Sequence, residues 1–361
     1  MPGGVTARRS RVGPAIEPTW RTEMGDAPLA LAMCRSGAYL AVAGGDGEVT
    51  VLDSSLGRVI HAWPAHAFGA LSVGWSSYNE CLASGGQDGM VRFWKVGHDE
   101  SIAAHPAAPF GGGIQERRVL PWVEHVSWSP DGRTCATAAG AHVALWDSEG
   151  QLVRRLPPFR STVADLQWLP DGERLSAVGY SGAMIWHRAD DHVAEALQWK
   201  GSFLCHAWAP TGKWLAAGMQ ESAVHIFETK TKGDLEMSGY AQKVLRLSWS
   251  DDGKRMITNG GPQGTVWNFA GNGPSGTRPV SLGGHALAVT DVAFFRQGLW
   301  VATCAEDGQL LVWNLAASSK QAMAAGFFPS AALRLAWHPR ERRIFTAHQS
   351  GWVVGWPVIR G

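Results

Sequence analysis

A unit of about forty residues recurs along the whole chain, and this periodicity constrains the fold more than any other feature. Each copy has an anchor residue, usually Trp, at the end of a short stretch whose apolar residues lie two apart, as in Val126 and Trp128. Successive anchors are separated by 42, 53, 40, 40, 41, 45 and 43 residues. The anchors are Met33, Trp75, Trp128, Trp168, Trp208, Trp249, Phe294 and Trp337.

Each copy has the pattern of four short strands. An alternating apolar strand is followed by a turn such as Pro130-Asp131-Gly132, a strand of small residues, a tight Asp-Gly hairpin and a β-branched strand that ends in an aromatic residue. One such sheet cannot bury both of its faces, but blades stacked around an axis cover each other. The sequence therefore predicts an all-β, closed β-propeller of four-stranded antiparallel blades. Eight copies predict eight blades, and the weak first copy leaves seven as the alternative.

A stricter pattern of four polar and aromatic residues occurs in two distant copies. The His-to-Asp separation is 22 residues in both, the hydroxyl residue precedes the Asp by 4, and the Trp follows it by 6. The two sets are His66, Ser84, Asp88, Trp94 and His285, Thr303, Asp307, Trp313.

With these sets and the Trp146-Asp147 pair, the sequence resembles the WD-repeat (tryptophan–aspartate) β-propeller family over about residues 18–358. The resemblance implies that each set is a hydrogen-bonded tetrad with a structural role, although its residue types mimic a catalytic triad. We therefore predict no catalytic residue. The resemblance also implies that residues 18–24 supply the outer strand of the last blade, which would remove free sheet edges.

The predicted domain organisation is simple. Residues 1–17, with Arg8, Arg9 and Arg11, are expected to be a disordered basic arm, and residues 18–361 a single domain. The long spacing between the second and third anchors places an insertion loop at about 96–121. Its Pro- and Gly-rich composition is typical of a surface loop.

Charge and composition exclude several classes of protein. Lys plus Arg number 32 against 31 Asp plus Glu, so we expect no nucleic-acid partner, and no apolar run approaches a membrane span. Five well-separated cysteines favour a reducing cytoplasm, where disulfides are rare. The 24 Arg against 8 Lys suggest a bacterial source.

The resemblance implies that partners dock on one face of the ring, which we call the top face. It comprises the loops that lead into the inner strands and the turns between the second and third strands. Charged residues three positions before the anchors have either of two roles, pairing between blades or contact with a partner. The candidate partner-binding residues are Trp122, Glu124, His125, Asp165, Arg246, Asp291, Arg334 and Trp352.

A metal site is a weaker hypothesis. His125, Asp165 and Cys205 occupy the same register in three consecutive copies, and all three are possible metal ligands. His206 replaces the usual apolar residue two positions before its anchor, and we expect it to be a buried, hydrogen-bonded histidine. The predicted function is a non-catalytic scaffold for proteins or peptides, with no cofactor. The alternative is an accessory propeller that holds a metal or small ligand at its channel.

Overall fold

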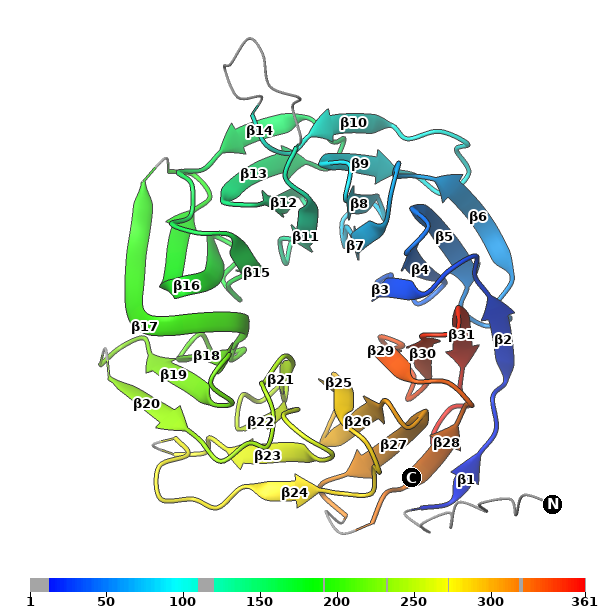
Figure 1. Ribbon diagram of the computed structural model, residues 1–361, viewed down its shortest axis with the longest axis vertical. Coiled ribbons are helices and arrows are strands. Elements are labelled where there is room, and N and C mark those ends of the chain that lie inside the picture. The colour runs from blue at the N-terminus through cyan, green and yellow to red at the C-terminus, as the bar shows by residue number, and fades with distance from the viewer. Residues whose placement is uncertain are drawn as a thin grey trace, which may run out of the picture.

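The computed structural model describes residues 13–109, 120–190, 192–231, 233–271, 273–317 and 321–360. These residues form 31 β-strands and no helix, and the strands are arranged as a ring of radial sheets around a central channel (Figure 1). The all-β propeller that the sequence predicts is therefore confirmed. Every repeat copy contributes an inner strand beside the channel and two middle strands, and an outer strand at the rim completes it; for the last copy this outer strand comes from the N-terminal segment.

The inner strands end at the anchor residues or close to them, because the alternating apolar pattern of the sequence sets their length. They are β3 (Pro28–Met33), β7 (Ala70–Trp75), β11 (Val123–Trp128), β15 (Val163–Trp168), the second half of β17 (Val193–Trp208), β21 (Leu247–Trp249), β25 (Val289–Phe294) and β29 (Ala332–Trp337). The second strands are β4 (Tyr39–Gly44), β8 (Leu82–Gly86), β12 (Thr134–Ala139), the first half of β16 (Arg174–His187), β18 (Trp214–Met219), β22 (Arg255–Thr258), β26 (Trp300–Ala305) and β30 (Ile344–His348).

The third and outer strands complete the sheets. The third strands are β5 (Glu48–Asp53), β9 (Met90–Trp94), β13 (His142–Asp147), the second half of β16, β19 (Val224–Glu228), β23 (Gly264–Asn268), β27 (Gln309–Asn314) and β31 (Trp352–Gly355). The outer strands are β6 (Val59–Pro64), β10 (Ala103–Pro106), β14 (Leu152–Arg155), the first half of β17, β20 (Asp234–Met237), β24 (Val280–Leu282), β28 (Ala324–Phe327) and β2 (Trp20–Glu23).

The number of sheets corrects the expectation of eight separate blades. The strands form seven hydrogen-bonded sheets, which is the alternative number, and one of these sheets has six strands, β15 to β20. Copies four and five of the sequence repeat share this sheet, because β17 pairs with β16 at one end and with β18 at the other. The hairpin within β16 is closed by a hydrogen bond from Arg188 N to Glu173 O (2.8 Å). Copies four and five are thus present as two repeat units but not as two separate sheets.

The ring closes through the N-terminal segment. Strand β2 pairs antiparallel with β31, with Trp20 opposite Gly355 and Glu23 opposite Trp352 (Figure 1). The preceding strand β1 (Ala15–Ile16) runs parallel to β28. The prediction that all of residues 1–17 are disordered is therefore wrong for β1, whereas residues 1–12 lie outside the described residues.

The insertion also differs from its expected form. Within the predicted loop at 96–121, β10 pairs antiparallel with β9, with Ala103 opposite Phe93, and supplies the outer strand of the second copy. Only part of the predicted loop is therefore irregular. Residues 110–119, which include the Gly-rich run, lie outside the described residues.

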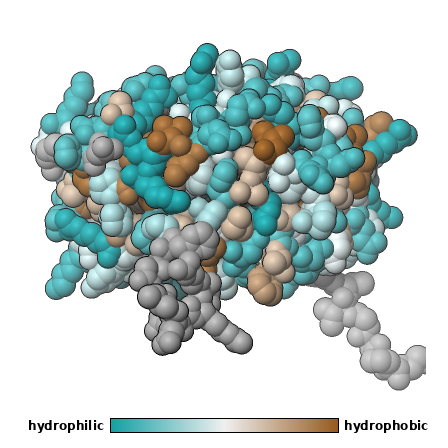
Figure 2. Space-filling view, turned by 90° about the horizontal axis from the view of Figure 1, so that it is seen from above, coloured by the Kyte–Doolittle hydropathy of each residue, from teal (hydrophilic) through white to brown (hydrophobic). Residues whose placement is uncertain are grey.

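Large aromatic side chains hold neighbouring copies together. Five anchor indoles each donate a hydrogen bond from Nε1 to a backbone oxygen of the preceding inner strand, at 2.8–3.1 Å. The pairs are Trp75 with Ala32, Trp128 with Gly74, Trp168 with Ser127, Trp249 with Ala207, and Trp337 with Ala293. These bonds fix the register between inner strands, while small second-strand residues such as Ala83 give the indoles room. Seen edge-on, the disc has a mostly hydrophilic rim with separate hydrophobic patches (Figure 2).

Candidate functional site

The top face carries exposed apolar side chains close to the start of the inner strands. Five large apolar residues there are at least 44% exposed; four lie in loops, and Tyr180 lies at the bend of the long strand β16. They are Phe68 (65%), Tyr180 (64%), Leu287 (51%), Trp122 (49%) and Leu245 (44%), which we call the top-face apolar set. Burying such side chains against a partner is favourable, and aromatic residues are frequent anchors of protein interfaces.

The predicted residues Trp122, Glu124 and Trp352 all lie on this face. Trp122 and Glu124 are exposed at the start of β11. Trp352 is only partly exposed, because its ring lies 6.1 Å from the ring of Phe328 and the guanidinium of Arg21 stacks over it at 5.9 Å. Trp122 is therefore the more accessible of the two tryptophans, and Trp352 mainly packs within the last copy.

The predicted acidic residues Asp165 and Asp291 pair with the neighbouring copy. Asp165 accepts a hydrogen bond from the backbone N of His206, and Asp291 accepts one from the backbone N of Leu335, both at 2.9 Å. In each case the other carboxylate oxygen accepts from the next residue of its own strand. Of the two roles considered for this register, these contacts favour pairing between copies.

Two basic residues of the same register, Arg246 and Arg334, interact with Asp291. Arg246 Nε lies 3.7 Å from Asp291 Oδ1. Burial lowers the pKa of Arg334, and repulsion from Arg246 adds to the effect while Asp291 opposes it. Burial also lowers the pKa of His125, against the attraction of Asp165. Asp291 is buried, and Arg246, Arg334 and His125 are half-buried, so these four side chains are less accessible to a partner than the top-face apolar set.

The second copy contains the full tetrad. His66 Nδ1 lies 2.9 Å from Asp88 Oδ1, His66 Nε2 lies 3.0 Å from Ser84 Oγ, and Trp94 Nε1 donates to Ser84 Oγ at 2.9 Å. Burial alone would raise the pKa of Asp88, but the hydrogen bond and charge attraction with His66 outweigh burial and lower it. The Ser84 hydroxyl links strands through these hydrogen bonds. Because Ser84 is fully buried, this hydroxyl is inaccessible to a substrate.

The tetrad of copy seven is incomplete. His285 Nε2 lies 2.8 Å from Thr303 Oγ1, and His285 Nδ1 lies 3.4 Å from Asp307 Oδ1. The expected link from Trp313 to Thr303 is not formed, since the buried Trp313 Nε1 has no hydrogen-bond partner among the described residues. The structure thus brings the four residues together but joins only three of them.

A third quartet spans copies four and five, and it was not predicted as a unit from the sequence. His206 Nδ1 lies 2.9 Å from Asp165 Oδ2, His206 Nε2 lies 2.7 Å from Ser176 Oγ, and Trp208 Nε1 donates to Ser176 Oγ at 2.8 Å. Burial would raise the pKa of Asp165, yet attraction and hydrogen bonding from His206 lower it to about 2. The expectation of a buried, hydrogen-bonded His206 is confirmed. The sequence signal for this quartet was His206 itself, a polar residue two positions before the anchor, where the other copies have Val or Leu.

The metal-ligand candidates do not converge. Cys205 Sγ donates to Val244 O in the next copy at 3.4 Å, and burial raises the pKa of this thiol to about 12. Asp165 is occupied by His206. Among the described residues, no group of three His, Cys, Asp or Glu side chains is arranged to hold a metal ion. The alternative of a metal-binding channel is therefore not supported.

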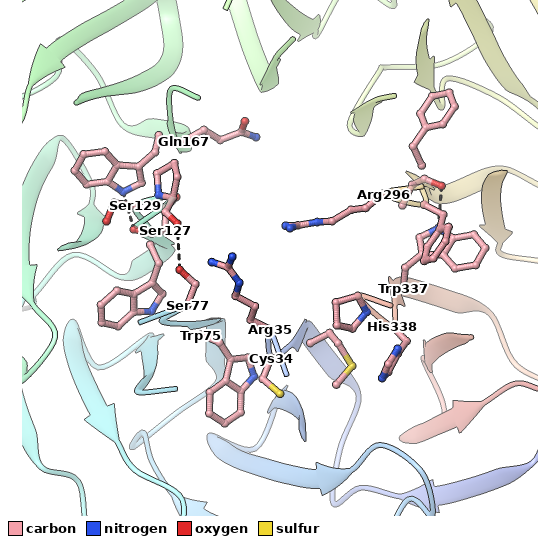
Figure 3. A pocket seen from close by; sticks show the side chains of 18 residues that line it. Cys34, Arg35, Trp75, Ser77, Ser127, Ser129, Gln167, Arg296, Trp337 and His338 are labelled. Carbon is pink, nitrogen blue, oxygen red and sulfur yellow. Dashed lines mark hydrogen bonds between the residues drawn. The ribbon is translucent and has the colours of Figure 1, made fainter. Parts of the chain in front are cut away.

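A cavity of about 660 Å³ occupies the channel at the opposite, bottom face, where the turns between inner and second strands lie. Its wall includes the anchors Trp75, Trp128, Trp168 and Trp337, and no Asp or Glu is among its lining residues. Arg35 and Arg296 extend into the open channel from different copies (Figure 3). The sequence pointed to the top face and to a ligand in the channel, but it did not predict this cavity at the bottom face.

Comparisons with known proteins support the assignment of the sequence repeat. The family model "WD domain, G-beta repeat" matches residues 57–95, 117–147 and 276–314. The chain is 33% identical over 300 residues to "Anaphase-promoting complex subunit cdh1" of Dictyostelium discoideum, covering 80% of this chain and 36% of that protein. It is 25% identical over 294 residues to "Cell division cycle 20.1, cofactor of APC complex" of Arabidopsis thaliana, covering 77% and 52%. The chain thus spans about a third to a half of these relatives.

Two further matches bear on shorter segments and on the fold. "Target of rapamycin complex subunit wat1" of Schizosaccharomyces pombe is 32% identical over 116 residues, covering 32% of this chain and 36% of that protein. The crystal structure of the computationally designed Ika8 protein superposes with a TM-score of 0.75 at 18% identity, covering 96% of this chain and all of that one. At that identity the likeness shows the fold alone.

The comparisons also correct one inference from composition. These natural relatives come from a slime mould, a yeast and a plant, all eukaryotes, which contradicts the bacterial source suggested by the excess of Arg over Lys. Separately, the described residues contain no helix that is long and apolar enough to span a membrane.

Proposed function

We propose that this protein, a member of the WD-repeat β-propeller family, is a non-catalytic adaptor that binds protein or peptide partners on its top face. The observation that carries the proposal is the top-face apolar set, whose members belong to five different repeat copies. Other large exposed apolar side chains, such as Val153 and Phe327, lie on outer strands at the rim. The relatives support the proposal, because their names describe subunits or cofactors of protein complexes.

The proposal includes a single domain in residues 18–361, consistent with the pairing of β2 with β31 across the ring closure. It also includes a reducing, cytoplasmic setting. All five cysteines are free and buried, which suits a compartment where thiols stay reduced. We propose neither a cofactor nor a catalytic role, since the fully buried hydroxyls of the quartets leave no accessible nucleophile there.

A capture experiment with matched variants tests the docking face. The test variant carries Phe68→Ser, Trp122→Ser and Leu287→Ser on the top face, and the control carries Leu56→Ser, Val153→Ser and Phe327→Ser, which are similarly exposed elsewhere. Tagged wild type and both variants are used to capture partners from cells of the source organism, with quantification by mass spectrometry. We expect the top-face variant to lose the stoichiometric partners by about tenfold or more, because hot-spot truncations exceed 1 kcal/mol each.

Two controls make the result decisive. Melting temperatures of both variants should stay close to that of the wild type, since the substituted side chains are exposed. If both variants retain the wild-type partners equally, the top face is not the docking surface. If the control variant alone loses them, the partner binds at the rim.

A further inference from the structure

The turns of the bottom face carry an uneven distribution of charge. In copies seven, eight and one, which are consecutive around the ring, the turns between inner and second strands hold five Arg and a single acid, Glu341. The corresponding turns of copies two to six hold six acids and three basic residues. We call the five arginines the arginine sector: Arg35, Arg296, Arg340, Arg342 and Arg343.

Part of this sector is already engaged. Arg343 pairs with Glu341 at 3.3 Å, and the guanidinium of Arg342 stacks over Trp300 at 4.7 Å. Arg35, Arg296 and Arg340 are exposed and form no direct ion pair within the described part of the chain. Asp251 of copy six attracts Arg296, but from outside the cavity wall. Three guanidinium groups therefore remain available to an anion.

Two of the three available guanidinium groups line the 660 Å³ cavity of the channel mouth. Arg35 and Arg296 line it, and Arg340 directly follows the lining residues His338 and Pro339 (Figure 3). Lysine is absent from these three turns. Arginine is suited to this role, since its planar guanidinium binds a carboxylate through two parallel hydrogen bonds.

The wall of the cavity is apolar as well as basic. Met33 and Phe294 line it together with the edges of several anchor indoles. A free inorganic anion would leave this apolar surface uncovered, whereas an extended peptide that alternates acidic and apolar side chains would satisfy both surfaces. A nucleic acid would fit this site less well than a peptide, because acidic turns adjoin the arginine sector on both sides of the ring.

We propose that the arginine sector and its cavity form a second docking site, which takes an acidic peptide segment of a partner protein. The site goes beyond the top-face adaptor function, because it lies on the opposite face and uses charge as well as apolar contact. A partner bound there would leave the top-face apolar set free.

Peptide binding to the full-length protein tests the proposal. The probe is a fluorescein-labelled eight-residue peptide that alternates Glu and Leu, and its control has Gln in place of Glu. We expect saturable binding of the Glu peptide by fluorescence anisotropy, weakened by salt, and about tenfold loss on Arg35→Gln/Arg296→Gln as two charge-assisted contacts disappear. Arg58→Gln, an exposed arginine in a turn farther from the channel on the same face, should change the affinity less than about twofold.

The remaining outcomes overturn the proposal. These are no binding of the Glu peptide, equal binding of the Gln peptide, or unchanged affinity in the double variant. Inorganic tripolyphosphate is measured in parallel by calorimetry, and tighter binding of tripolyphosphate than of the peptide would assign the sector to a phosphate ligand instead. The Phe68→Ser/Trp122→Ser/Leu287→Ser variant should bind the peptide normally, so failure of the top-face function is distinguishable from failure of this one.

Discussion

At the scale of single residues, buried hydroxyls connect the strands of several copies. Ser84 links a histidine and a tryptophan, and Ser176 does the same across copies four and five. In copy three Thr137 accepts from Trp146, and in copy six Tyr240 takes this place by bonding both Thr258 and Trp267. In these copies a hydroxyl thus accepts a hydrogen bond from an indole, even where the residue that carries the hydroxyl changes.

The difference between the tetrads of copies two and seven makes a stability prediction. Ser84→Ala removes the partner of both His66 and Trp94, and leaves two buried polar groups unpaired. Thr303→Val removes the partner of His285 alone, because Trp313 makes no such bond. We expect losses in the free energy of unfolding of about 2–4 kcal/mol and about 1–2 kcal/mol, respectively. Urea unfolding followed by tryptophan fluorescence measures both, and equal losses would contradict the assigned bonding.

At the scale of elements, the tight turns of the top face also support the loops of the next copy. The Asp46-Gly47 turn accepts a hydrogen bond from His66 N to Gly47 O at 2.9 Å, and the loop that it holds carries Phe68. Gly89 and Gly308 accept similar bonds from Ala107 and Phe328 at 3.1 and 3.0 Å. Glycine is needed at Gly47 because its φ is +91° and a Cβ would overlap the carbonyl oxygens of His66 and Phe68.

A matched pair of glycine substitutions separates the need for a positive φ from the need for space beside the Cα atom. Gly97 has almost the same φ, +92°, but a Cβ there would meet nothing within 4 Å. Gly97→Ala should therefore cost only the backbone strain of about 1–2 kcal/mol. Gly47→Ala should cost about 3–5 kcal/mol, since displacement of the neighbouring loop adds to that strain. Denaturation midpoints test the difference, and similar losses would show that the loop adjusts without penalty.

The sequence predicted the repeated elements better than their connections. Strand order and the anchors followed from the forty-residue period, because alternation of apolar residues reports which face is buried. The outer strand β10 was missed, because outer strands are half exposed and Ala103–Pro106 has no alternating apolar pattern. The sharing of β16 and β17 was also missed, since copy four has Tyr180-Ser181-Gly182 where copies one, two and seven have an Asp-Gly turn.

The candidate site was only partly predictable for a similar reason. Periodicity placed Trp122 and Trp352 on the top face, but their different exposure depends on Phe328 and Arg21, which come from the loop after β28 and from β2. Asp165 and Asp291 were partner-binding candidates because of their register, and only the hydrogen bonds to His206 and Leu335 reveal that they pair between copies. The contribution of Phe68 and Leu287 to the top face depends on loop exposure, which the repeat pattern leaves undetermined.

At the scale of the whole molecule, stability depends on closing the ring. Strand β2 covers the edge of β31, and the largely buried Trp20 donates a hydrogen bond to Ser54 O of copy one at 3.0 Å. The same short segment thus completes the last sheet and joins it to the first. An unpaired β31 would offer its backbone groups to other chains.

Truncations test the closure directly. Removing the residues before Pro18 deletes β1 but leaves β2, and we expect a small loss of stability. Removing the residues before Gly25 also deletes β2 and Trp20, and it should lower the melting temperature by roughly 10 °C or more and promote aggregation. Calorimetry and light scattering compare the two proteins. Identical melting of both would mean that β2 is dispensable for closure.

The continuous strand β17 has a consequence for attempts to cut or reconnect the chain. It runs without a break from the rim to the channel wall, and so copies four and five have no loop between them (Figure 1). New termini for circular permutation, or the division point of a split reporter, would there sever a paired backbone instead of a surface connection. Engineered fragments that keep copies four and five together should reassemble more readily than fragments divided between them.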